Sequence, residues 1–115
     1  MIIKRGDILL VNLEPVMGSE QGKTRPCIVI QTDLANNYSP TTIIAAITSS
    51  LSDKQYPTEV IIYPKESGLQ KESTVLLNQI RTISLKDRAI KKVGSLSKEK
   101  MTEINEALKI SLGFD

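Results

Sequence analysis

The feature that most constrains this chain is a succession of short apolar, β-branched runs, each followed by a turn-forming stretch. Glycine, asparagine, serine and aspartate gather between the runs, for example in residues 17–22, 36–40 and 49–53. Short strands separated by such turns predict a mainly β protein, a small barrel of about seven strands. The expected strands are residues 7–13, 26–31, 42–47, 59–63, 74–77, 79–84 and 90–93.

The spacing of apolar residues changes to a helical period after Gly94. Ser97 stands where a helix N-cap belongs, and Gly113 stands where a helix commonly ends. The apolar positions of this segment are Met101, Ile104, Ala107, Leu108 and Leu112. We therefore predict one amphipathic C-terminal helix that closes the barrel or meets a partner. The 115 residues contain no linker-like or repeated segment, so we expect one domain over residues 1–115.

The start of the chain carries Lys4 and Arg5 but no apolar run long enough for a signal peptide or a membrane span. We therefore expect a cytoplasmic protein without membrane contact. Cys27 is the only cysteine and lies within an apolar run, so we expect a buried thiol. A net charge of +2 is too small to indicate nucleic-acid binding by itself.

The absence of histidine limits the chemistry more than any residue that is present. Imidazole acid–base catalysis and a Ser-His-Asp triad are excluded. With one cysteine and no histidine, a zinc site built from the usual sulfur and nitrogen ligands is excluded as well. We therefore expect neither a metal nor another cofactor.

The first segment that could carry chemistry is residues 18–26, which place two glycines and several polar side chains between two predicted strands. Arg25 precedes Pro26, and a proline favours an extended backbone at the residue before it, which would hold the Arg25 guanidinium at the start of a strand. The alternative is an ordinary solvated hairpin loop, and composition alone favours that alternative.

Two further segments place polar side chains next to predicted strands. Thr48, Ser49 and Ser50 follow an apolar strand, although an ordinary Ser/Thr turn would have the same composition. Further along, Gln79 and Arg81 alternate along a strand and should share one face, on either a binding surface or an exposed sheet edge.

Taken together and in this order, these segments resemble the MazF/PemK family of toxins, which includes EndoA-like messenger-RNA interferases. The resemblance extends over nearly the whole chain. It is carried by Arg5-Gly6-Asp7-Ile8, Gly18-Ser19-Glu20-Gln21-Gly22-Lys23-Thr24-Arg25-Pro26, Ile47-Thr48-Ser49, Leu77-Asn78-Gln79-Ile80-Arg81-Thr82 and the C-terminal Ala107-Leu108-Lys109-Ile110-Ser111-Leu112-Gly113.

The resemblance implies an SH3-like barrel with a C-terminal helix, assembled as a homodimer that binds single-stranded RNA. It also implies ribosome-independent, sequence-specific cleavage of RNA without a metal. The 2′-OH of the substrate attacks the neighbouring phosphorus, which leaves a 2′,3′-cyclic phosphate and a 5′-OH. DNA would be bound but uncut. A MazE-like antitoxin with a flexible acidic tail would be the partner, and genomic DNA would be met only through the antitoxin complex.

Arg25 and Thr48 match the catalytic positions of the family, and Glu20 matches a functionally important glutamate. A guanidinium hardly loses its proton, so we expect Arg25 to donate hydrogen bonds to the phosphate, with the Thr48 hydroxyl as a second donor. Glu20 either takes the 2′-OH proton or holds Arg25 in place. We expect the RNA contacts to come from Ser19, Gln21, Gly22, Lys23, Ser49, Gln79 and Arg81.

The sequence departs from some relatives at Met17, where they carry an aromatic residue. With three tyrosines and one phenylalanine, we expect hydrogen bonds rather than base stacking to dominate recognition. Two rival functions remain open at this point. One is a gyrase poison of the CcdB type, although those rely on a tryptophan near the chain end and this chain has none. The other is a barrel that binds RNA or peptide without catalysis.

Overall fold

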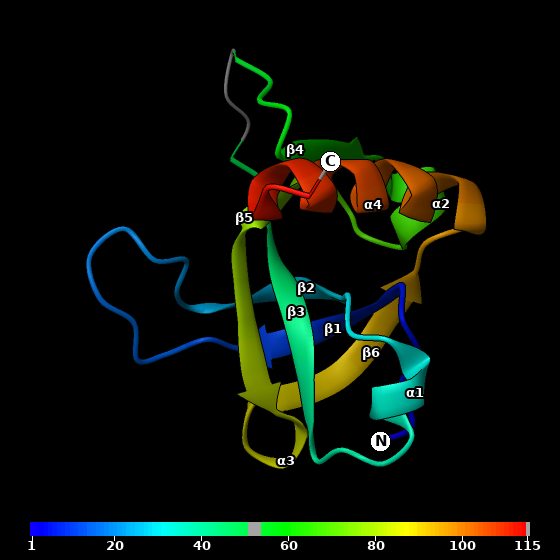
Figure 1. Ribbon diagram of the computed structural model, residues 1–115. Coiled ribbons are helices and arrows are strands. Elements are labelled where there is room, and N and C mark those ends of the chain that lie inside the picture. Colours follow the sequence, from blue (N-terminus) through cyan, green and yellow to red (C-terminus); the bar gives the residue numbers. More distant parts are fainter. Residues whose placement is uncertain (51–53, 115) are drawn as a thin grey trace.

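The computed structural model, which describes residues 1–50 and 54–114, is built around one antiparallel sheet (Figure 1). Six strands lie in the order β4-β5-β3-β2-β1-β6. Their bounds are β1 Asp7–Asn12, β2 Thr24–Val29, β3 Thr41–Thr48, β4 Glu59–Ile62, β5 Ser73–Ser84 and β6 Ala89–Ser95. The mainly β class predicted from the sequence is confirmed.

The sheet differs from the predicted barrel in two ways. Among the described residues it has six strands rather than seven, and its outer strands β4 and β6 do not pair, so the barrel is not closed. The runs 74–77 and 79–84 are one strand, β5, continuous through Asn78. The register of β5 against β3 shifts between Ala45 and Ala46, which face Ile80 and Leu76. This bulge bends the strand, and its exposed Asn78 resembles a turn in the sequence.

Helix α4, Lys98–Leu112, confirms the predicted C-terminal helix. The Ser97 side chain accepts a hydrogen bond from the Lys100 N–H, and Gly113 ends the helix in the left-handed conformation with φ of 80°. The helix lies over one end of the sheet, against β4 and β5 (Figure 1). Of the apolar residues at helical spacing, Met101, Ile104 and Ala107 are buried, whereas Leu112 is 49% exposed and lies outside the core.

Three one-turn helices were not predicted. They are α1 Asp33–Asn36, α2 Pro64–Ser67 and α3 Leu85–Arg88. Each is four residues long, too short to give an apolar period, and each starts from a local signal instead. The Thr32 and Ser84 side chains cap α1 and α3, and Pro64 opens α2.

The two faces of the bent sheet each bury an apolar cluster. One cluster lies under α4 and includes Ile8, Ile62 and Ile104, and the other includes Leu9, Leu13 and Cys27. Cys27 is fully buried, as predicted. Within the part of the chain that the structure describes, no helix is long and apolar enough to cross a membrane.

Candidate active site and RNA-binding surface

Arg25 and Thr48 belong to neighbouring antiparallel strands and come together at one sheet end. Strand β2 pairs with β3 so that Cys27 faces Ala46. Arg25 lies two residues before Cys27 on β2 and Thr48 two residues after Ala46 on β3, so both lie at the same end of this strand pair. The Arg25 Nε–H donates to the Gly22 carbonyl oxygen at 2.8 Å, and the Thr48 hydroxyl oxygen accepts from the Ser50 N–H at 3.1 Å. Each side chain is thus fixed by a backbone group while remaining half-buried.

Both residues line a pocket of about 440 Å³, here called the Arg25 pocket. Its lining combines hydroxyl groups with two cations, and none of its described residues is an aspartate or glutamate. Such a lining suits a phosphate, which accepts hydrogen bonds and carries negative charge. The lining residues are Thr24, Arg25, Pro26, Ile47, Thr48, Ser49, Ser50, Leu69, Gln70, Lys71 and Ser73.

A long loop, residues 13–23, joins β1 to β2 and projects from the sheet (blue in Figure 1). The Leu13 N–H donates to the Lys23 carbonyl oxygen at 2.9 Å, and the Lys23 N–H donates to the Glu14 carboxylate. Lys23 has a φ of 65°, and a Cβ at Gly22 would overlap the Glu14 carboxylate. The base of the loop is therefore closely packed, whereas Met17 near its tip is 80% exposed.

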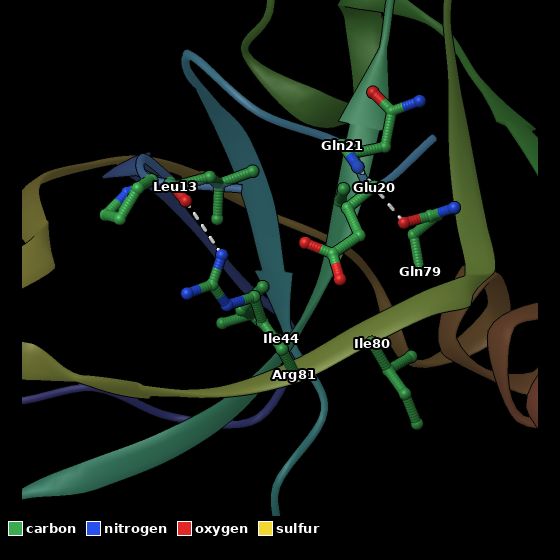
Figure 2. A pocket seen from close by; sticks show the side chains of 9 residues that line it. Leu13, Glu20, Gln21, Ile44, Gln79, Ile80 and Arg81 are labelled. Atoms are coloured by element: carbon green, nitrogen blue, oxygen red, sulfur yellow. Dashed lines mark hydrogen bonds between the residues drawn. The ribbon is translucent and has the colours of Figure 1, made fainter. Parts of the chain in front are cut away.

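A second pocket, here called the Gln79 pocket, lies between this loop and β5 and has a volume of about 300 Å³. The Gln21 N–H donates to Gln79 Oε1 at 3.2 Å, and Arg81 donates to the Leu13 carbonyl oxygen at 2.8 Å (Figure 2). Figure 2 shows Gln79 and Arg81 on one side of β5 and Ile80 pointing to the other, as the predicted alternation requires. The lining residues are Leu13, Pro15, Glu20, Gln21, Ile44, Ala46, Gln79, Ile80 and Arg81.

Glu20 belongs to this second pocket rather than to the Arg25 pocket. One carboxylate oxygen accepts from the Met17 N–H at 2.8 Å, and the side chain points into the space between Arg81 and Gln79 (Figure 2). Among the described residues, Glu20 and Arg25 form no ion pair. Arg25 is held by Gly22 instead, so the alternative in which Glu20 orients Arg25 is absent from this structure.

Cys27 lies on β2 in the buried cluster that also contains Ala46, which lines the Gln79 pocket. Burial raises the pKa of its thiol from 9.0 to about 12, although the positive charges of Arg25 and Arg81 act in the opposite direction. A thiol with so high a pKa is not a nucleophile near neutral pH. In the part of the chain that the structure describes, no three histidine, cysteine, aspartate or glutamate side chains are grouped to hold a metal.

The arrangement of two polar pockets beside a projecting loop can be compared with known proteins. The family model described as "PemK-like, MazF-like toxin of type II toxin-antitoxin system" matches residues 4–112. The chain belongs to this toxin family. The resemblance inferred from the sequence motifs is thereby confirmed.

Individual members of the family agree with the assignment. The chain is 49% identical over 114 residues to "Endoribonuclease EndoA" from Bacillus subtilis, a match that covers 99% of the chain and 97% of the relative. It superimposes on MazF (form I) from Deinococcus radiodurans with a TM-score of 0.83 at 24% identity, covering 99% of each chain. The MazE-MazF crystal structure (form II) from the same organism gives 0.76 at 25% identity, covering 100% of this chain and 99% of that one.

In this toxin-family chain, the structure divides the predicted site residues between the two pockets. Arg25, Thr48 and Ser49 line the Arg25 pocket, and Glu20, Gln21, Gln79 and Arg81 line the Gln79 pocket. Of the other predicted RNA contacts, Ser19 and Lys23 are exposed on the loop, and Gly22 accepts the hydrogen bond from Arg25.

The sequence motifs did not identify the opposite wall of the Arg25 pocket, which consists of Leu69, Gln70, Lys71 and Ser73. This segment lies beside Thr48 because β3 pairs with β5, with Thr48 facing Thr74. A short polar stretch between a predicted loop and a strand carries no signal of its own, and the pairing partner of that strand was unknown from the sequence.

Proposed function

We propose that this protein is a sequence-specific endoribonuclease that cleaves single-stranded messenger RNA without a ribosome or a metal ion. The observation that supports this most directly is that Arg25 and Thr48 line one pocket whose described residues supply hydroxyl groups and no acid, in a chain 49% identical to an endoribonuclease. Single-stranded RNA fits such a surface because its bases and phosphates are both accessible.

In the proposed reaction the ribose 2′-oxygen forms a bond to the adjacent phosphorus, and the bond from phosphorus to the 5′-oxygen of the next nucleotide breaks. The products are a 2′,3′-cyclic phosphate and a 5′-OH. Negative charge builds on the phosphoryl oxygens in the transition state. Arg25, with its Nε–H already engaged by Gly22, would present its remaining N–H groups to these oxygens. The Thr48 hydroxyl would add one donor.

The proton of the attacking 2′-OH needs an acceptor, and Glu20 is the proposed one. Glu20 is the only carboxylate among the described residues that line either pocket. It stands on the projecting loop close to the exposed Met17, whose N–H donates to the Glu20 carboxylate. The departing 5′-oxygen would take its proton from water.

The partner we propose is an antitoxin of the MazE kind, as the family description and the MazE-MazF structure support. A flexible acidic segment would complement Arg25 and Lys71 and order as it binds. We further propose a homodimer acting in the cytoplasm, which meets DNA only through the antitoxin complex.

The test is incubation of the purified protein with a long unstructured RNA in excess EDTA. We expect discrete cuts with 2′,3′-cyclic phosphate and 5′-OH ends. Arg25→Ala and Thr48→Val should each lower the single-turnover rate on the order of 10² to 10³, the typical cost of losing one preorganised donor. Thr48→Ser keeps the hydroxyl and serves as the matched control. Intact RNA from folded, antitoxin-free protein would contradict the proposed function.

A further inference from the structure

The Arg25 pocket has a second positive charge, Lys71, in the α2–β5 loop of residues 68–72. Arg25 comes from β2 and Lys71 from the opposite wall, so the two charges approach a bound molecule from different elements. The Lys71 side chain is exposed and forms no ion pair among the described residues.

The backbone before Lys71 is fixed by the end of helix α2. Gly68 takes a φ of 78°, and its N–H donates to the Pro64 carbonyl oxygen at 3.2 Å. The buried Ser67 hydroxyl donates to the Tyr63 carbonyl oxygen at 3.0 Å and accepts from the Leu69 N–H at 3.1 Å. Leu69 packs against the core beneath α4.

The backbone at Lys71 itself is held by strand β5. The hydroxyl of Ser73, which is 4% exposed, donates to the Lys71 carbonyl oxygen at 3.0 Å. Behind the loop, Gly94 of β6 packs so closely that a Cβ there would overlap the Ser67 carbonyl group. Hydrogen bonds therefore hold the loop backbone on both sides of Lys71, and the long, exposed Lys71 side chain extends from this backbone.

We propose that Lys71 binds an RNA phosphate next to the one held by Arg25. An ammonium group on a flexible stem acts as a point charge, which suits a phosphate better than the patterned edge of a base. Phosphate contacts position a nucleic acid without reading its sequence. Lys71 would therefore raise affinity for every RNA and leave both selectivity and the chemical step unchanged. This inference rests on the proposed function, because it assumes that RNA occupies the pocket.

The test compares Lys71→Gln with Lys65→Gln, a matched control in α2 that is exposed and lines neither pocket. Binding is measured over a range of salt concentrations with a single-stranded oligoribonucleotide in which every 2′-OH is replaced by fluorine, so that it cannot be cut at any position. Loss of one phosphate contact should lower the slope of log affinity against log salt by about 0.7, which is roughly fivefold to tenfold in affinity at low salt. Lys71→Arg should restore binding.

Cleavage provides the second readout. Lys71→Gln should raise KM by a similar factor. Its saturated rate and its cut positions should equal those of the unchanged protein. An unaltered salt slope in folded Lys71→Gln, or a loss in the saturated rate alone, would overturn the inference. If the unchanged protein binds this RNA with a Lys71-dependent slope but never cuts the cleavable form, the proposed function fails and the inference stands.

Discussion

The Arg25 pocket and the Gln79 pocket share strand β3 but differ in the chemistry of their linings. Thr48 at the end of β3 belongs to the first pocket, and Ala46 belongs to the second. The first combines hydroxyl groups with two cations and has no described acid. The second has apolar walls, two glutamines, one carboxylate and an arginine already bound to a backbone carbonyl.

This difference suggests a division of labour. A phosphate requires positive charge and donors, which the Arg25 pocket supplies, whereas a base requires an apolar slot with a few placed hydrogen-bonding groups. The Gln79 pocket has that character, with the Gln79 amide fixed by the Gln21 N–H. Two predictions test whether chemistry and recognition are separated in this way, and a third concerns the buried thiol of Cys27, whose pKa the charges of Arg25 and Arg81 both lower.

The largest effect is expected from Glu20→Gln. This substitution tests whether a residue of the Gln79 pocket takes part in the chemistry. The amide oxygen can still accept from the Met17 N–H, so the loop should keep its shape. Loss of the proposed proton acceptor should lower the single-turnover rate on the order of 10². An unchanged rate would confine Glu20 to recognition.

A smaller effect, and one on selectivity rather than rate, is expected from Gln79→Ala. A glutamine that makes paired hydrogen bonds to one base is worth about 1–3 kcal/mol of discrimination, or roughly 5-fold to 150-fold. Cleavage of a randomised RNA pool should therefore show a relaxed preference at one position. Asn78→Ala is the matched control, since Asn78 is exposed and lines neither pocket. Relaxation at no position would remove Gln79 from recognition.

The effect that is smallest near neutral pH concerns Cys27, because burial raises the pKa of its thiol more than the positive charges of Arg25 and Arg81 lower it. Burial raises the pKa of its thiol above the ordinary 9.0, so the folded state favours the neutral form. That contribution to stability is complete below pH 9 and is lost as pH rises from about 9 toward 12. The loss has a limiting slope of about 1.4 kcal/mol per pH unit. The free energy of unfolding of Cys27→Ala, measured with urea, should lack this decrease between pH 9 and 12. An equal decrease in Cys27→Ala and the unchanged protein would contradict the expectation.

Much of this fold could be predicted because its elements carry local signals. Ser97 and Gly113 mark both ends of α4, and the β-branched runs mark the strands. The continuation of β5 through Asn78 could not be predicted, because a β-bulge depends on the register with the partner strand and not on the type of residue at the bulge. The same limit applies to the site. Arg25 and Thr48 were found through family motifs, whereas Lys71 becomes visible only once β3 and β5 are paired.

The placement of both pockets along β3 also fixes the distance between them. Ala46 and Thr48 are two residues apart on one strand, a separation of about 7 Å that the sheet holds constant. Under the proposed division, in which the Gln79 pocket binds a base and the Arg25 pocket binds the phosphate, the backbone of β3 sets the offset between the bound base and the broken bond. Variants selected for new recognition sequences should therefore inherit the same offset from base to cut.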